Sequence, residues 1–389
     1  MRKIALVTTS RADYGIQSRL IRMLQDDEEI AFSLIVSGSH LSEKHGMSVH
    51  EIENDGIAIA ERIDLGIDAD GSSAARVLSR GIIAFCDVLT RLQPDICILL
   101  GDRYEMFAAA VSCVLVGVAV AHLHGGETTE GANDEVFRHS ITKAAFLHFT
   151  SCEAYWRRVI QMGEAAERVY NVGSLGVENI GQMNLLEKAA LARELGVEFS
   201  EQNLLVAFHP VTFERGTALR QVDELLAALD GFPAATLVFT HPNADDEGDA
   251  IADRIRAYAK RRNKVYLFKS LGARRYLSML RIVDALVGNS SSGIIEAPSL
   301  KTPTVNVGDR QKGRIQARSI VNCPVEREAI KVAVKTVLAP AFKAVLAETV
   351  NPYAKPDTAS TIINILKKPD LDIRLKKKFY DIDFADSMQ

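Results

Sequence analysis

The chain carries its densest group of titratable side chains in residues 122–140, HLHGGETTEGANDEVFRHS. The group consists of His122, His124, Glu127, Glu130, Asp134, Glu135, Arg138 and His139. Ionisable groups crowded onto one loop perturb each other's pKa values, which is what a general acid and a general base require. The two leading histidines, at i and i+2, would share one face of a strand end. General acid–base catalysis is the favoured interpretation; a metal site is the alternative, without HExxH spacing.

A second catalytic candidate is Asp102, in the segment GDRYE that follows the apolar run ICILL. A carboxylate at the end of a buried strand costs more free energy than one at an ordinary surface position, which indicates a functional reason for keeping it. The alternative is a structural role, in which Asp102 pairs with Arg103 or caps the next helix. Arg103 is itself a candidate contact for an anionic substrate.

Two further loops of the first half could bind an anion. The segment TTSRADYG at 8–15 lacks the GxGxxG spacing of a dinucleotide site. Arg11 and the N-terminus of the following helix would instead hold an anion with a guanidinium and free backbone N–H groups. A solvated arginine is the alternative. His40, in the segment SGSH, could line the same site or serve the structure only.

Polar residues of the second half predict a diphosphate site. The segment GNSSSGIIEAPSL at 288–300 is typical of a strand, a serine-rich turn and a helix, whose hydroxyl and N–H groups would hold phosphate oxygens without a Walker-type lysine. Glu296 could accept both ribose hydroxyls. A serine N-cap that binds no ligand is the alternative. The candidate contacts from this half are His209, Asn243, Ser290, Ser291, Ser292, Gly293, Glu296, Arg310 and Arg314.

Short apolar runs alternate with amphipathic stretches, which is typical of parallel sheets covered by helices on both faces. Strands are expected at 4–9, 32–38, 96–102, 118–124, 147–151, 169–173, 204–210, 235–242, 265–270, 285–290 and 304–308. Helices are expected at 16–25, 74–92, 105–117, 219–229, 246–262, 273–281 and 291–300. The sequence therefore predicts an α/β protein of two doubly wound, Rossmann-like domains with an interdomain cleft. The expected domains are 1–178 and 190–368, with a tail at 369–389 that could pack on the N-terminal domain.

The composition excludes several classes of protein. The 46 basic and 50 acidic residues give a net charge of −4, whereas a nucleic-acid binder would show a basic excess. The five scattered cysteines indicate buried free thiols in a reducing compartment. No apolar run is long enough for a membrane-spanning helix, and the N-terminal run is too short for a signal peptide. We therefore expect a cytoplasmic protein that has no membrane partner.

Several segments together resemble the UDP-N-acetylglucosamine 2-epimerase family, most closely its hydrolysing branch, which makes N-acetylmannosamine for bacterial sialic acid synthesis. They are SRADYG, GDRYE, HLHGGE, DEVFRHSITK, FHPVT, GNSSSGIIEAPSL and GDRQKGR. The resemblance implies a GT-B-like fold, no metal or redox cofactor, and UDP held mainly by the C-terminal domain. By motif position, the nucleotide-binding residues are Arg11, His209, Asn243, Ser290, Ser291, Glu296 and Arg310. The catalytic carboxylates are Asp102, Asp134 and Glu135, with Arg138 beside them; His124 is a departure, since many relatives have glutamate there.

The reaction implied by this resemblance removes UDP from UDP-N-acetylglucosamine and inverts the sugar at C2, by anti elimination to 2-acetamidoglucal and then hydration. The catalytic candidates are Asp102, His124, Glu127, Asp134, Glu135 and His209, with the acid and the base unassigned. The alternatives are the same reaction on UDP-N,N′-diacetylbacillosamine, a non-hydrolysing epimerase, a GT-B glycosyltransferase and a non-catalytic UDP-sugar sensor. We expect a homo-oligomer, a dimer or a tetramer, and the apolar helical stretch 105–117 could serve a dimer as easily as a core.

Overall fold

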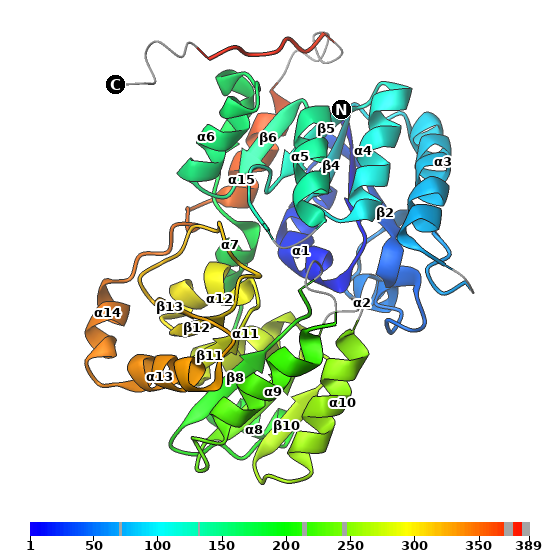
Figure 1. The fold of residues 1–389 in the computed structure, drawn as a ribbon. Coiled ribbons are helices and arrows are strands. Elements are labelled where there is room, and N and C mark those ends of the chain that lie inside the picture. The colour runs from blue at the N-terminus through cyan, green and yellow to red at the C-terminus, as the bar shows by residue number, and fades with distance from the viewer. Residues whose placement is uncertain (70–71, 131–132, 212–215, 243–246, 369–375, 383–389) are drawn as a thin grey trace. The chain divides into compact units, whose positions relative to one another are not determined.

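The computed structural model describes residues 1–69, 72–130, 133–211, 216–242, 247–368 and 376–382, and it divides into two compact units (Figure 1). The first unit consists of Met1–Glu127, Asp134–Asn179 and Tyr353–Gln389, and the second of Thr128–Asn133 and Ile180–Pro352. Each unit contains one parallel sheet, so the expected α/β class with two doubly wound domains is confirmed. Among the described helices, none is long and apolar enough to cross a membrane.

The first unit is built on seven parallel strands in the order β3-β2-β1-β4-β5-β6-β7. Their bounds are β1 Arg2–Thr8, β2 Ile30–Ser37, β3 Ile59–Ile63, β4 Ile96–Leu100, β5 Ala119–Leu123, β6 Leu147–Thr150 and β7 Val169–Asn171. Every residue of β4 and β5 is buried, because helices cover both faces of the sheet. The strand order reverses between β1 and β4, and the loops that follow these strands therefore diverge at the carboxyl edge, where such sheets bind ligands.

The helices of the first unit form one layer on each face of this sheet. They are α1 Arg11–Gln25, η1 Gly38–Leu41, α2 Val49–Asn54, α3 Ala74–Leu92, α4 Tyr104–Val116, α5 Asp134–Ala144, α6 Glu153–Gln161, η2 Ala166–Arg168, α7 Leu175–Gln182 and α15 Thr358–Lys367. α3, α4 and α5 share a core with Val7 and Leu99, whereas α1 and α15 share a core with Leu6 and Ile98. Successive strand residues point to opposite faces, which is why neighbouring residues belong to different cores.

The second unit repeats this architecture with six parallel strands in the order β10-β9-β8-β11-β12-β13. The strands are β8 Asn203–Ala207, β9 Thr236–Thr240, β10 Val265–Phe268, β11 Ala285–Gly288, β12 Thr304–Val307 and β13 Ile320–Cys323. The helices are α8 Lys188–Leu195, α9 Ala218–Leu229, α10 Gly248–Ala259, α11 Gly272–Ile282, α12 Ser292–Ile295, η3 Ala297–Leu300, α13 Arg327–Leu338 and α14 Phe342–Glu348. The order reverses between β8 and β11, which approach so closely that a Cβ at Gly288 would overlap the carbonyl oxygen of Ala207.

The boundary of the first unit differs from the domain limits expected from the sequence. α15 packs against α1, and Ile362 and Leu366 share a core with Leu20 and Leu24. The chain therefore returns to the first unit at Tyr353. The sequence analysis assigned residues 353–368 to the C-terminal domain, whereas the structure places them in the first unit. The apolar spacing of α15 predicts a buried helical face, but it does not say which of two sheets that face covers.

The described part of the C-terminal tail, residues 376–382, contacts the first unit through a buried ion cluster. Lys377 Nζ lies 2.5 Å from the carboxylate of Glu164, which is fully buried. Glu164 also accepts from Lys143 Nζ at 2.6 Å and lies 3.0 Å from Nε2 of His148. Lys377 donates to two backbone carbonyls at the end of α5, each at 2.8 Å. Lys377 and the backbone N–H of Tyr380, which donates to the Gly163 carbonyl at 3.0 Å, therefore tie the tail to the rest of the first unit.

Two of the observed strands were not expected from the sequence, and one expected helix is divided in two. β3 and β13 were not expected, and both are edge strands with polar residues such as Glu61 and Asn322 in place of a continuous apolar run. The helix expected over 291–300 is divided into α12 and η3. The break coincides with Pro298, whose missing N–H cannot continue an α-helical hydrogen-bond ladder.

Candidate active site

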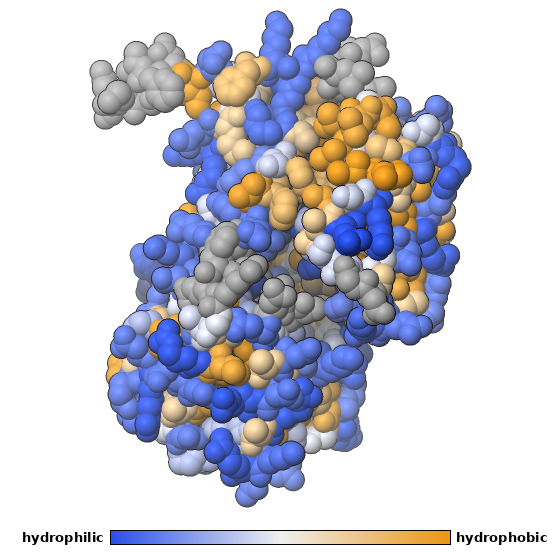
Figure 2. Space-filling model, turned by 45° about the vertical axis from the view of Figure 1, so that its right-hand side comes forward, coloured by the Kyte–Doolittle hydropathy of each residue, from blue (hydrophilic) through white to orange (hydrophobic). Residues whose placement is uncertain are grey.

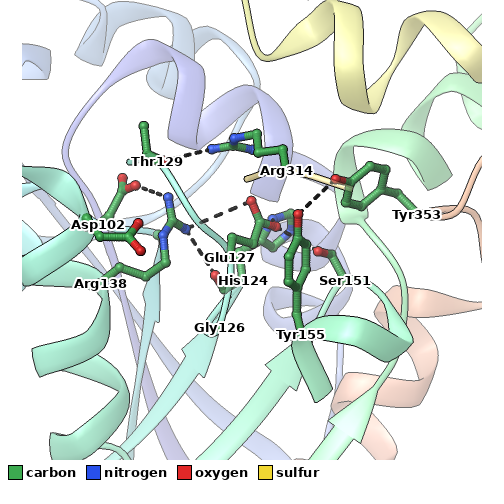
Figure 3. Close-up of polar contacts among 12 residues, drawn as sticks. Asp102, His124, Gly126, Glu127, Thr129, Arg138, Ser151, Tyr155, Arg314 and Tyr353 are labelled. Atoms are coloured by element: carbon green, nitrogen blue, oxygen red, sulfur yellow. Dashed lines mark hydrogen bonds and ion pairs between the residues drawn. The ribbon is translucent and has the colours of Figure 1, made fainter. Parts of the chain in front are cut away.

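Arg138, on α5, is the centre of a polar cluster in the first unit (Figure 3). Its side chain is 3% exposed and forms an ion pair with Asp102, which follows β4. It also donates to the backbone carbonyl of His124 at 3.0 Å and lies 4.0 Å from Oε2 of Glu127. A buried guanidinium that contacts several acceptors fixes their relative positions. The cluster therefore joins residues that follow two neighbouring strands and a residue of the next helix.

His124 has an unusual backbone conformation and an unpaired ring nitrogen. Its φ is +63°, which is uncommon for a residue with a Cβ atom. Its Nδ1 lies 2.9 Å from Oε1 of Glu127, and the Ser151 hydroxyl donates to the same oxygen at 2.7 Å. A carboxylate that accepts a hydrogen bond from Nδ1–H selects the tautomer with a lone pair on Nε2. Nε2 is buried and has no hydrogen-bond partner among the described residues, so its lone pair is available to accept a proton.

His122 has a structural role and does not share a face with His124. Its Nε2 lies 2.8 Å from the carbonyl oxygen of Gly101, and its Nδ1 lies 3.1 Å from the Thr142 hydroxyl. Burial lowers the pKa of His122 to about 3, which keeps the ring neutral. The expectation that both histidines share one strand face is wrong, because β5 ends at Leu123 and the backbone then turns into the left-handed region.

The carboxylates at the start of α5, Asp134 and Glu135, are half-buried. Glu135 accepts from Nε2 of His139 at 3.0 Å, one helical turn further along. Negative charge is favoured in the first turn of a helix by the helix dipole. Glu127, and not Glu135, is therefore the carboxylate that the structure places on His124. Within the described residues, no group of three or more His, Cys, Asp or Glu side chains is arranged to hold a metal ion.

A second charged cluster lies where the strand order reverses, between β1 and β4. The Nε of Arg103 lies 3.3 Å from the carboxylate of Glu105, which is fully buried. Asp13 accepts from the Thr9 hydroxyl at 2.8 Å. Burial raises the pKa of Asp13, and the nearby charge of Arg103 opposes that rise. The sequence analysis missed Asp13 and Glu105, although both lie in quoted motifs, because spacing does not show that the two loops meet.

Arg11 and His40 lie at the same sheet edge with different exposures. Arg11 is the first residue of α1 and forms an ion pair with Glu51, and both side chains are about 40% exposed. His40 is fully buried, with its ring nitrogens 3.0 Å from the Thr8 hydroxyl and 2.8 Å from the Ser48 hydroxyl. Burial lowers the pKa of His40 to about 4. These contacts favour the structural alternative for His40 over the one in which it lines an anion site.

Asn289 ties together the loops at the carboxyl edge of the second sheet. Its side chain accepts from the backbone N–H of His209 at 2.7 Å and donates to the carbonyl of His209 at 2.9 Å. Its own carbonyl accepts from Arg310 at 3.1 Å and from Gln311 at 2.9 Å. Burial and the charge of Arg310 lower the pKa of His209 to about 3, so its ring is neutral. Sequence analysis missed Asn289, which lies inside the GNSSSG motif. Asn289 also lines a cavity of about 140 Å³.

The serine-rich turn after β11 lies beside Tyr276 of α11. Ser290 and Ser292 are half-buried, and interactions with both hydroxyls oppose the effect of burial, which raises the pKa of Tyr276 to about 12. The half-buried carboxylate of Glu296 is also close enough to raise that pKa. A tyrosine that remains protonated can donate a hydrogen bond to an anion, and the sequence analysis did not identify it.

The backbone N–H groups of this turn were expected to hold phosphate oxygens, but two of them are already hydrogen-bonded within the protein. The N–H groups of Gly293 and Ile294 donate to the carbonyls of Ser290 at 3.1 Å and Ser291 at 2.9 Å, so these two amides are engaged within the turn. Gly293 serves packing, because a Cβ there would lie 2.6 Å from the Thr304 side chain. The groups available for an anion are consequently the serine hydroxyls more than the helix amides.

The loop that carries Arg310 and Arg314 packs on the short segment 128–130, which belongs to the second unit. Arg314 donates to the Thr129 hydroxyl at 3.3 Å. Gly313 has φ of +83°, and a Cβ there would lie 2.6 Å from the Glu130 carboxylate, which requires glycine. Asn243, the remaining predicted contact, lies outside the described residues.

The chain is similar to known proteins in both sequence and fold. Residues 22–367 match the family model described as UDP-N-acetylglucosamine 2-epimerase. The chain is 39% identical over 326 residues to a GDP/UDP-N,N′-diacetylbacillosamine 2-epimerase (hydrolyzing) of Campylobacter jejuni, covering 83% of this chain and 85% of the relative. It is 38% identical to polysialic acid biosynthesis protein P7 of Escherichia coli over 388 residues, 98% of each chain. The S. aureus MnaA–UDP structure matches with a TM-score of 0.80 at 16% identity, over 98% of this chain and 100% of the other, which confirms the GT-B-like fold.

Proposed function

Because the chain belongs to the UDP-N-acetylglucosamine 2-epimerase family, we propose that it removes UDP from a UDP-linked 2-acetamido sugar while inverting the sugar at C2. The products are UDP and the free 2-epimeric sugar. The observation that carries this proposal is the buried His124–Glu127–Ser151 array beside the Arg138–Asp102 ion pair. These groups supply a base and a fixed carboxylate at one edge of one sheet.

The proposed reaction needs proton transfer and leaving-group stabilisation together. The C2 hydrogen is not acidic in the bound sugar, but it becomes acidic as the C1–O bond breaks and C1 gains oxocarbenium character. A base takes the C2 proton, the C–H electrons form the C1=C2 bond of a 2-acetamidoglucal, and the C1–O electrons leave with UDP. Water then adds its oxygen to C1, and C2 receives a proton on the opposite face.

We assign the first proton transfer to Nε2 of His124. The imidazolium formed there is stabilised by Glu127, which the Ser151 hydroxyl holds in place. Asp102, kept as a carboxylate by Arg138, takes the proton of the attacking water. The proton for the opposite face of C2 comes from the carboxylate pair at the start of α5. Each of the three proton transfers is therefore assigned to a different group.

UDP is proposed to bind at the carboxyl edge of the second sheet. Ser290, Ser292 and Arg310 would hold the diphosphate, and Glu296 would accept the ribose hydroxyls. The neutral His209 is suited to donating a hydrogen bond to the leaving oxygen. The mechanism requires that this group and the proton carriers of the first unit act on the same sugar nucleotide. The five cysteines are free thiols, which supports a cytoplasmic location.

Two UDP-sugars are candidates for the substrate. UDP-N,N′-diacetylbacillosamine is supported by the C. jejuni relative, which is named for it. UDP-N-acetylglucosamine, expected from the sequence, is supported by the matching family model, which is named for it. In both sugars C2 carries an acetamido group and the hydrogen that the base removes. The two sugars differ at C4 and C6. We place the diacetylated sugar first and its monoacetylated counterpart second.

The test is to incubate the chain with each UDP-sugar alone, measure free UDP by chromatography and identify the sugar by proton NMR. We expect stoichiometric UDP and a free sugar of inverted C2 configuration, with the larger kcat/KM for the diacetylated substrate. His124→Gln should abolish both products and retain UDP binding. Release of UDP only after an acceptor is added would refute the proposal in favour of a GT-B glycosyltransferase. An epimeric UDP-sugar without free UDP would identify a non-hydrolysing epimerase.

A further inference from the structure

Residues 376–382, the described part of the C-terminal tail, are held on the rest of the first unit at several points. We call this segment the tail strap. The ring of Phe379 packs on Gly163 so closely that a Cβ there would overlap the ring, and Lys143 Nζ lies 4.7 Å from the ring centre. The backbone N–H of Tyr380 donates to the carbonyl of Gly163 at 3.0 Å. Terminal segments are well ordered where such contacts tie them down, so the tail strap is a built part of the first unit.

Lys377 gives the tail strap its charged contact, and this contact lies at the C-terminal end of α5. The ammonium group donates to the carbonyls of Lys143 and Ala145, each at 2.8 Å. It also lies 2.5 Å from the carboxylate of Glu164, so each of its three N–H donors has an acceptor. The last carbonyls of a helix have no partner inside the helix, and the helix dipole places partial negative charge on them. Lys377 therefore caps α5 from a distant part of the chain.

The carboxylate of Glu164 joins the tail strap to α5 and to β6 at once. It is fully buried, accepts from Lys143 Nζ at 2.6 Å and lies 3.0 Å from Nε2 of His148 on β6. Lys143 is 39% exposed, whereas Lys377 is 19% exposed. An ion pair is stronger where less water surrounds it. The tail strap thus supplies the less hydrated of the two lysines that balance this buried charge.

Helix α5 carries residues of the candidate site toward its other end. Asp134 and Glu135 lie in its first turn, and Arg138 follows one turn later. Five residues separate Arg138 from Lys143, a distance of about 7.5 Å along the helix axis. The hydroxyl of Thr142, in the last turn, donates to the carbonyl of Arg138 at 3.0 Å. A displacement of the C-terminal end of α5 would therefore move Arg138 as well.

We propose that the tail strap positions α5 for catalysis and that Lys377 is the positioning residue. Lys377 acts through the end of α5, which fixes Arg138 and with it the ion pair to Asp102. The effect on turnover rests on the proposed function, whereas the hold of the strap on α5 does not. A misplacement of 1 Å far from the reacting atoms can lower a rate by about 10²-fold, so loosening one end of α5 should lower kcat roughly 10-fold. KM should not change, because the proposed UDP contacts belong to the second unit.

The first test compares Lys377→Met with Lys376→Met, a control that removes the same charge from the adjacent, exposed residue. Figure 2 shows hydrophilic side chains projecting into solvent at the top of the first unit, where the tail strap lies. At a temperature below the melting onset of every variant, kcat of Lys377→Met should be roughly 10-fold lower with KM unchanged. Lys376→Met should stay within about twofold of the wild type. A wild-type kcat for Lys377→Met would overturn the proposal, as would an equal loss in both variants.

The second test asks whether the contacts of the tail strap act as one unit. Phe379→Ala removes the ring from Gly163, and Tyr380→Ala is its control, because the hydrogen bond of Tyr380 comes from the backbone. Phe379→Ala should lower kcat, and Tyr380→Ala should not. The double variant Lys377→Met/Phe379→Ala should be no slower than Lys377→Met alone, since a released strap cannot be released again. Losses that multiply in the double variant would refute a common strap.

The third test measures the position of α5 without substrate, by amide hydrogen exchange and mass spectrometry of the full chain. Peptides that cover α5 and the tail strap should exchange faster in Lys377→Met than in the wild type and in Lys376→Met. Peptides of the second unit should exchange equally in all three proteins. Unchanged exchange in α5, or a tail strap that already exchanges at the unprotected rate in the wild type, would overturn the proposal. Because this measurement uses no UDP-sugar, its failure is distinguishable from failure of the proposed reaction.

Discussion

Replacing Arg138 by methionine removes the guanidinium at the centre of the polar cluster in the first unit. The guanidinium is 3% exposed and contacts Asp102, which is 21% exposed. Breaking a buried ion pair costs about 3–5 kcal/mol, and the partial exposure of Asp102 places this case near 3 kcal/mol. At about 2–4 °C per kcal/mol for a domain of this size, the melting temperature should fall by about 6–12 °C. Turnover should fall ~10²–10⁴-fold, because the proton carriers lose their alignment.

The matched control is Arg157→Met, because Arg157 is 74% exposed and its ion pair with Glu153 lies on the helix surface. Such a pair contributes about 0–1 kcal/mol, so this variant should melt within about 2 °C of the wild type. Calorimetry gives the melting temperatures, and titration calorimetry should give the same UDP affinity for both variants. Adding Asp102→Asn to the Arg138 variant should recover part of the lost stability. The reasoning is refuted if both arginine variants melt together, or if Arg138→Met keeps normal turnover.

Two further predictions concern single contacts. Ser151→Ala removes a hydrogen bond to the buried Glu127, so kcat should fall ~10-fold with KM unchanged; a change confined to KM would contradict the positioning role. Burial raises the pKa of Glu164, but hydrogen bonds from His148, Lys143 and Lys377 outweigh it and lower that pKa from 4.5 to about 2, so the stability that Glu164 contributes is present above about pH 4.5 and is lost as the pH falls toward 2. Lys377→Met should therefore lower the melting temperature at pH 7, with a difference from the wild type that shrinks below pH 4; a constant difference would contradict this account.

The fold could be predicted where strands are buried on both faces. β4 and β5 are continuous apolar runs, and their loops carry Asp102 and His124 as expected. The edge strands β3 and β13 could not be found, because polar residues interrupt their apolar runs, whereas the edge strands β7 and β10 were predicted. The packing of α15 on the first unit could not be predicted either. An amphipathic pattern predicts that one face of a helix is buried, but it does not identify the element that covers this face.

The candidate site was predicted as a set of residues and not as an arrangement. Titratable clusters mark Glu127 and Arg138 in the sequence, but contacts between distant loops decide which groups act together. The Ser151 hydroxyl joins Glu127 from the next strand, and no spacing rule links them. Burial likewise separates His40 and His122 from His124, because two of the three rings are bonded within the protein at both nitrogens.

The most direct test of the proposed proton transfer is a single proton NMR time course in D2O with UDP-N,N′-diacetylbacillosamine, and with UDP-N-acetylglucosamine in parallel. Abstraction of the C2 hydrogen by His124 and delivery of a solvent-derived deuteron to the opposite face of C2 predict one deuterium at C2 of the released sugar, together with an equal amount of free UDP. A released sugar that keeps its original hydrogen at C2 would contradict the account.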